Sequence, residues 1–176
     1  MPIDQRKTIR GALAGALAAG AWAAQMPLDK RLFASEFDDV ELLGKTLTRS
    51  RGWPLAGWIW HVQNGALFGA VYANLAPRIP LPSWARGPAL AMAENFLTWP
   101  LVALSDRLHP AREQLPKSFA SPRALAQSTW RHALFGILLG ELERAFNRQD
   151  TVEMPAYEHV ISSNGHGKLE HATSAN

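Results

Sequence analysis

GWPLAGWIWHVQNGALFGAVYANLAP, residues 52–77, contains no aspartate, glutamate, lysine or arginine. Three further stretches are nearly as poor in charge, namely residues 11–28, residues 87–105 and residues 124–140. A helix needs about 20 residues to cross a hydrocarbon core about 30 Å thick, and each stretch is near that length. The sequence therefore predicts an all-α fold, a four-helix transmembrane bundle with these stretches as its spans.

The segments around the four stretches complete the predicted organisation. Residues 1–147 form the four-helix membrane domain, and residues 148–176 form a polar tail that is expected to be disordered. Between the first two spans, SEFDDVELLGKTLTRS (residues 35–50) predicts a short amphipathic helix, capped by Ser35 and lying along the membrane interface. The first long helix is expected to stop at Pro27, and Ser121 is placed to cap the last one.

Composition leaves a soluble four-helix bundle as an alternative. Apolar residues make up 47% of the chain, but the mean hydropathy is only −0.12, and alanine-rich helices also build soluble bundles. Such a bundle needs a charged outer face on each helix, which these stretches lack. We therefore expect a multi-pass protein of the bacterial inner membrane, with the lipid bilayer as its partner and homo-oligomers as a further option. The basic residues before the first stretch also resemble a signal peptide.

Glycine pairs predict close packing between the helices. Three G-x-x-x-G pairs occur, and they comprise Gly11, Gly15, Gly65, Gly69, Gly136 and Gly140. Such pairs allow helix backbones to approach closely. An Arg-Gly dipeptide opens the first and third stretches, and Ala-Leu-Phe-Gly occurs at residues 66–69 and again at 133–136. A duplicated helix hairpin would explain both repeats, although chance matches are common in alanine- and glycine-rich sequence.

Polar side chains inside the stretches define a candidate intramembrane layer. Its members are His61, Asn64, Glu94, Asn95, Arg131 and His132. His61 and Asn64 are three residues apart and therefore share a helix face. Ionisable residues within spans are functional candidates, but interhelical hydrogen bonds that fix the packing are the favoured explanation in so small a bundle. Because side chains tilt toward the N-terminus of their own helix, a direct Glu94–Arg131 salt bridge requires the helix ends to shift.

Several classes of function receive no support. The chain has no cysteine, which excludes disulfides and thiolate metal sites. No lysine and arginine cluster interleaved with aromatics occurs, so nucleic acid is not an expected partner. Catalytic signature motifs are missing. His61 and His132 are weak evidence for haem, and three tail histidines (His159, His166 and His171) are too dispersed for a metal site. We expect no enzymatic activity, no cofactor and no metal.

The order of features resembles the YagU family of small bacterial inner-membrane proteins, whose biochemical function is unknown. The shared pattern places His61 eleven residues before Tyr72, followed by Pro77, Trp84 and Gly87. AENFLTWPLVAL (residues 93–104) and TWRHALFGILLGELERAFNR (residues 129–148) complete it. The likeness covers residues 10–148. Asn95 stands where the family pattern has a histidine, which weakens the proton-responsive layer that the family's association with acid tolerance implies.

These observations support three functions. The first is a non-enzymatic structural or stress-related component of the inner membrane. An alternative is a proton or small-solute carrier that uses His61, Glu94, Arg131 and His132. A second alternative is a soluble four-helix bundle that binds a ligand.

Overall fold

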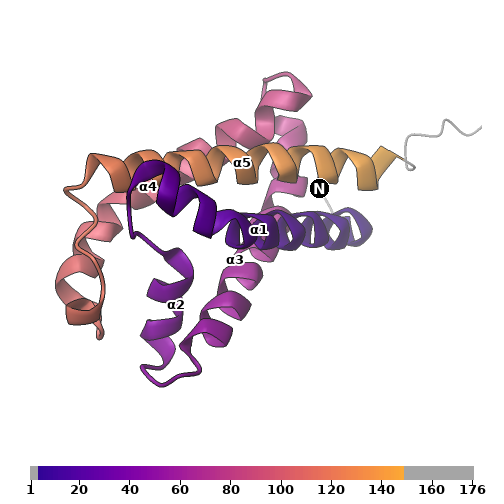
Figure 1. Cartoon of the computed structure of the whole chain (residues 1–176). Helices are drawn as coiled ribbons and strands as arrows, with labels where there is room; N and C mark the ends of the chain where they lie inside the picture. The colour runs from indigo at the N-terminus through magenta and orange to yellow at the C-terminus, as the bar shows by residue number, and fades with distance from the viewer. Residues whose placement is uncertain (1–3, 149–176) are drawn as a thin grey trace, which may run out of the picture.

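The computed structural model describes residues 4–148, and in this range the chain is all-helical (Figure 1). The α-helices are α1 (Gln5–Phe33), α2 (Asp39–Leu47), α3 (Trp53–Leu75), α4 (Ser83–Leu108) and α5 (Pro122–Asn147). Single 3-10 turns, Ala76–Arg78 and Arg112–Gln114, follow α3 and α4. The predicted disordered tail lies outside the described residues, apart from Arg148.

The predicted membrane spans are wrong. Within residues 4–148, no helix combines the length and the hydrophobicity that a bilayer crossing requires. Insertion is driven by leucine, isoleucine, phenylalanine and valine, whereas much of each uncharged stretch is alanine, glycine and polar side chains. The helices also run past the stretches, so that α1 includes Arg10 before the first stretch and Asp29 after it. The fold is therefore all-α, as predicted, and the short helix predicted within residues 35–50 is present as α2, but the transmembrane bundle and the multi-pass inner-membrane location are not supported.

The end of α1 differs from the sequence-based prediction. The helix continues past Pro27 and stops at Ala34, which adopts the left-handed conformation with φ 46°. Pro27 removes one hydrogen bond to the carbonyl of Ala23, which weakens the helix locally. Met26 and Asp29, on either side of the proline, are both buried in the fold. Tertiary packing thus outweighs the proline signal and carries Asp29 into the interior.

Side-chain caps begin α2 and α5. The predicted Ser35 cap is wrong, because α2 begins after Asp38, whose Oδ1 accepts a hydrogen bond from the Glu41 N–H at 2.8 Å. The predicted Ser121 cap is confirmed, since its hydroxyl accepts from the Ala124 N–H at 3.2 Å. Each cap satisfies one of the backbone donors left free in a first helical turn.

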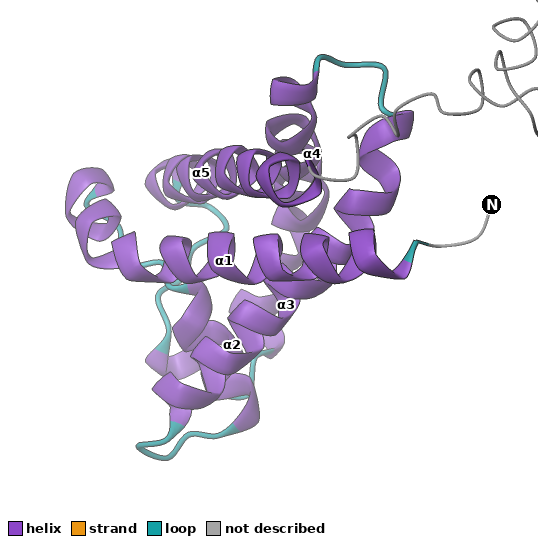
Figure 2. Cartoon of the chain, turned by 90° about the vertical axis from the view of Figure 1, so that its right-hand side faces the viewer, coloured by secondary structure: helices purple, strands orange, loops and turns teal. Residues whose placement is uncertain are grey.

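The long helices form two antiparallel hairpins, α1 with α3 and α4 with α5 (Figures 1 and 2). α1 and α5 run side by side in opposite directions and join the hairpins, and α2 packs on α3. We call the α1–α5 contact the seam; its buried apolar side chains are Ala14, Ala18, Trp22, Met26, Phe135 and Leu139. In the described chain, α3 and α4 make almost no contact with each other. The cavity described below is lined by residues of both helices.

The predicted packing glycines of α1 and α3 lie where these helices touch. A Cβ atom added to Gly15 would overlap the carbonyl group of Gly65, and one added to Gly69 would overlap that of Gly11. The two helices therefore meet backbone to backbone over at least two turns. This approach leaves room for no side chain larger than hydrogen at the crossing.

The second hairpin uses the same type of contact. A Cβ atom on Gly136 would lie 2.7 Å from the carbonyl oxygen of Gly87, whereas Gly140 is packed more loosely, 3.5 Å from the Tyr72 hydroxyl. In both hairpins, the Arg-Gly dipeptide of one helix faces the Ala-Leu-Phe-Gly motif of the other. A duplicated hairpin would have this arrangement.

Candidate functional site

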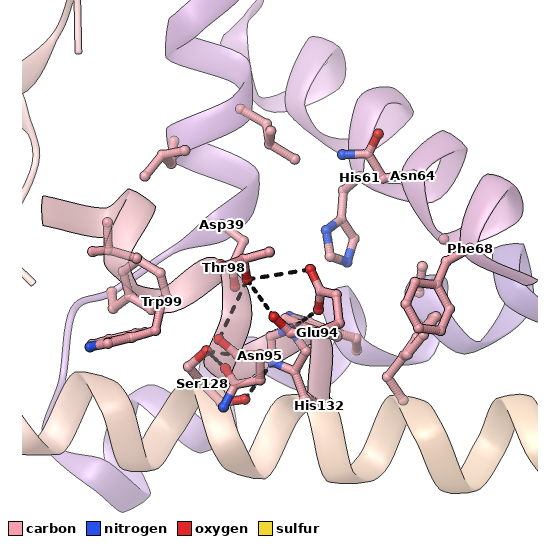
Figure 3. Close-up of a pocket in the computed structure, with 18 residues that line it drawn as sticks. Asp39, His61, Asn64, Phe68, Glu94, Asn95, Thr98, Trp99, Ser128 and His132 are labelled. Atoms are coloured by element: carbon pink, nitrogen blue, oxygen red, sulfur yellow. Dashed lines mark hydrogen bonds and ion pairs between the residues drawn. The ribbon is translucent and has the colours of Figure 1, made fainter. Parts of the chain in front are cut away.

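A cavity of about 230 Å³ lies between α3 and α4, and all five α-helices contribute to its wall (Figure 3). Its polar lining residues include His61, Asn64, Glu94, Asn95, Ser128 and His132. Its apolar lining includes Trp22, Phe37, Phe68, Trp99 and Phe135. Five of the six residues of the predicted polar layer thus line one cavity, and the sixth, Arg131, lies elsewhere.

Glu94 and His132 form an ion pair across the α4–α5 contact. His132 Nε2 lies 2.7 Å from Glu94 Oε2, and the other ring nitrogen, Nδ1, lies 2.8 Å from the Ser128 carbonyl oxygen. A carbonyl oxygen only accepts hydrogen bonds, so Nδ1 carries a proton. A second proton therefore lies between Nε2 and Oε2. The His132 side chain is 11% exposed and that of Glu94 is 38% exposed, so Glu94 is the more accessible member of the pair.

Asn95 links α4 and α5 next to the Glu94–His132 pair. The Ser128 hydroxyl donates to Asn95 Oδ1 at 2.7 Å, and Asn95 Nδ2 donates to the Thr129 hydroxyl at 3.2 Å. Asn95 is fully buried and its amide is satisfied on both sides. These bonds fix the register of α4 against α5, which holds the Glu94–His132 pair in place.

His61 reaches the cavity from α3 and points toward Glu94 (Figure 3). Its residue is 8% exposed, and its Nε2 has no hydrogen-bond partner among the described residues. Burial lowers the pKa of His61 below its ordinary value, and the carboxylate of Asp39 opposes this shift only in part. The imidazole is therefore neutral near pH 7, with one ring nitrogen acting as an acceptor.

Trp22 lies between the two histidines at the seam. Its ring contacts His61 and His132 edge to face, with centroids 5.1 Å and 4.6 Å apart. The indole Nε1 is buried and, like His61 Nε2, has no partner within residues 4–148. Buried polar atoms in native proteins are nearly always hydrogen-bonded, so two unpartnered atoms on residues of one cavity wall are unusual.

The lowered pKa of His61 predicts a pH-dependent stability. Because folded His61 resists protonation, the unfolded chain gains the proton first as the pH falls below about 6.5. The free energy of unfolding of the wild type is expected to fall by up to about 1.4 kcal/mol per pH unit between about pH 6.5 and 5.5. The free energy of unfolding of His61→Phe should fall less than that of the wild type over this pH range. Urea titrations at both pH values measure the difference, and equal losses in the two proteins would exclude His61 as the source.

Arg131 belongs to a buried cluster behind the cavity. Its Nε and Nη2 donate to the two carboxylate oxygens of Asp29, both at 2.7 Å, and its Nη1 donates to Asp39 Oδ2 at 2.8 Å. Gln127 Nε2 also donates to Asp29, at 2.6 Å. The side chains of Arg131 and Asp29 are 0% exposed. Neither Glu94 nor His132 takes part in this cluster.

The charges in this cluster support one another. Burial would raise the pKa of Asp29, but hydrogen bonds from Arg131 and Gln127 and the guanidinium charge outweigh burial and hold it below its ordinary value. Burial would likewise lower the pKa of Arg131, but Asp29 and Asp39 together raise it. Asp29 and Arg131 are thus both charged near pH 7, and with the carboxylate of Asp39 the cluster holds two acidic groups and one basic group.

Sequence reasoning missed Asp29, Asp39 and Trp22 as partners of the polar residues. Asp29 follows Gln25 by four residues, and the Gln25 amide donates to its carboxylate along one face of α1. This i, i+4 spacing could have predicted the contact between Gln25 and Asp29, but only if the helix were known to continue through Pro27. Among residues 4–148, no three histidine, aspartate or glutamate side chains are placed to hold a metal ion. The tail histidines considered above lie outside the described residues.

Comparisons with known proteins found no matching family, curated protein or solved structure. The resemblance to the YagU family therefore stays a prediction.

Proposed function

We propose that this protein binds a small organic molecule in the cavity bounded by His61, Glu94 and His132, without transforming it. The observation that carries the proposal is a pair of buried polar atoms, His61 Nε2 and Trp22 Nε1, which have no partner in the described chain and belong to residues that line a single cavity. Leaving a buried polar group unsatisfied costs about 1–3 kcal/mol. A ligand that hydrogen-bonds to such a group recovers that free energy.

The volume of the cavity limits the size of the ligand. At roughly 30 Å³ per water-sized group, 230 Å³ admits about eight non-hydrogen atoms. Aromatic walls with a few convergent polar groups are typical of binding sites for small molecules. The proposal develops the ligand-binding alternative of the sequence analysis. The carrier alternative needs a path through a bilayer, and no described helix supplies a span.

Benzyl alcohol, which has eight non-hydrogen atoms, is a suitable neutral probe. We expect it to shift the Trp22 indole N–H signal in ¹⁵N-resolved NMR spectra in a saturable manner, with the signal assigned by Trp22→Phe. Benzylammonium and benzoate extend the probe set to both charges. Absence of any saturable shift with all three compounds would overturn the proposal.

Filling the cavity should abolish this response. Val102 lines the cavity, whereas Val71, on α3, is 48% exposed and does not line it. Val102→Trp is expected to weaken binding of every probe at least tenfold, because the indole occupies the ligand's volume. Val71→Trp introduces the same side chain outside the cavity and should leave the affinities unchanged. Equal binding by both variants would place the ligand elsewhere, and circular dichroism checks that both remain folded.

A further inference from the structure

We infer that the ligand is a small organic cation, an ammonium group attached to a flat apolar body of about seven further atoms. This inference rests on the proposed function and specifies its ligand class. Three independent features support it: the charge around the cavity, the kind of hydrogen-bonding atoms that face it, and the position of its aromatic wall.

The charge around the cavity is negative. Among its described lining residues, the carboxylates are Asp39 and Glu94, and none is a lysine or an arginine. Arg131 lies behind Asp39 and is shared between two aspartates, so this cluster holds two acidic groups and one basic group. The Glu94–His132 pair, with its shared proton, adds no positive charge to offset that excess. A cation entering the cavity is therefore attracted, and an anion is repelled.

On the Glu94 side of the cavity, the hydrogen-bonding atoms that remain available are acceptors. Glu94 Oε2 is taken by His132, but the only bond to Glu94 Oε1 within the described chain is a long one, 3.4 Å, from the Thr98 hydroxyl. Neutral His61 presents an acceptor nitrogen, and its ring points toward Glu94 across the cavity (Figure 3). An ammonium group donates several hydrogen bonds and accepts none. It can therefore satisfy Glu94 and His61 together, but not the Trp22 indole N–H, which is itself a donor.

The aromatic wall lies beside this acceptor pair. Phe68 follows His61 on α3 and faces the same cavity (Figure 3), and its ring contacts Phe135 edge to face at 5.4 Å. Trp22 contacts Phe135 in turn, with centroids 6.0 Å apart. Ring faces attract ammonium groups and pack against flat apolar bodies. The wall thus suits the remainder of the same ligand.

Three monosubstituted benzenes of similar size test the inference by calorimetry at pH 7.5: benzylammonium, benzyl alcohol and benzoate. Benzylammonium is expected to bind at least about tenfold more tightly than benzyl alcohol, since a charge-assisted hydrogen bond replaces a neutral one. Benzoate should bind more weakly than both. Glu94→Gln keeps the side-chain shape but removes the charge, and should reduce the preference for benzylammonium to within about threefold. Glu113→Gln, at a side chain 87% exposed, is the matched control and should keep the full preference.

The outcomes separate this inference from the proposed function. If benzyl alcohol or benzoate binds in the Val102-lined cavity as tightly as benzylammonium, the cation inference is wrong and the binding function stands. A preference that survives Glu94→Gln unchanged also contradicts the inference. If none of the three compounds binds, the proposed function itself fails.

Discussion

Gly15→Ala is expected to lower the free energy of unfolding by about 3 kcal/mol, whereas Gly20→Ala, in the same helix, should leave it unchanged or raise it by up to about 1 kcal/mol. The added methyl group at residue 15 overlaps the backbone of Gly65, and backbone atoms cannot rotate out of the way. At Gly20, no heavy atom lies within 4 Å of the new methyl group, so only the better helix propensity of alanine acts.

Urea denaturation followed by circular dichroism measures this contrast, because both variants keep the helical signal in the folded state. If Gly15→Ala does not fold, Gly140→Ala provides an intermediate test: its methyl group would meet the Tyr72 hydroxyl at 3.5 Å, an ordinary contact. The expected order of stability is Gly20→Ala, then Gly140→Ala, then Gly15→Ala. Equal effects at residues 15 and 20 would contradict the backbone contact between α1 and α3.

Asp29→Asn is expected to destabilise the fold by about 3–5 kcal/mol, since it leaves the buried Arg131 with Asp39 as its single anionic partner. The matched control is Glu36→Gln, which removes the same charge from an exposed residue and should change stability by less than about 0.5 kcal/mol. Chemical denaturation at pH 7 measures both. A loss below about 1 kcal/mol for Asp29→Asn would contradict a buried, charged pair.

The same substitution carries a pH signature. The pKa of Asp29 in the folded protein lies below its ordinary value of 3.8. The stabilisation that charged Asp29 gives to the fold is therefore complete above pH 3.8, and it is lost as the pH falls through the folded-state pKa. The stability gap between wild type and Asp29→Asn should therefore narrow below about pH 4. A gap that stays constant down to acid unfolding would show that Asp29 acts by packing and not by charge.

Helix content and the gathering of polar residues could be predicted because both follow from local patterns. His61 and Asn64 share a face by spacing alone, and Asn95 and His132 lie near the middle of long helices, in stretches with a single charged residue each. The membrane prediction failed because it counted uncharged residues. Alanine and glycine are uncharged but only weakly hydrophobic, and in this fold their small size serves helix contact.

The partners of Arg131 could not be predicted, since they depend on where a helix ends. Pro27 is a strong local signal for the end of a helix. A prediction that follows this signal places Asp29 in a loop and not on a helix face. Tertiary packing of the turn around Pro27 overrides that signal. Once Asp29 is inside, it binds Arg131, and Glu94 is left to pair with His132.

The near absence of contact between α3 and α4 has a mechanical consequence. The two hairpins meet along the seam, and a second link joins them, since His109 at the end of α4 contacts the Thr46 hydroxyl and the Leu42 carbonyl oxygen of α2. A molecule that touches both His61 and Glu94 would add a third link, directly between α3 and α4, at the place where these helices do not hold each other.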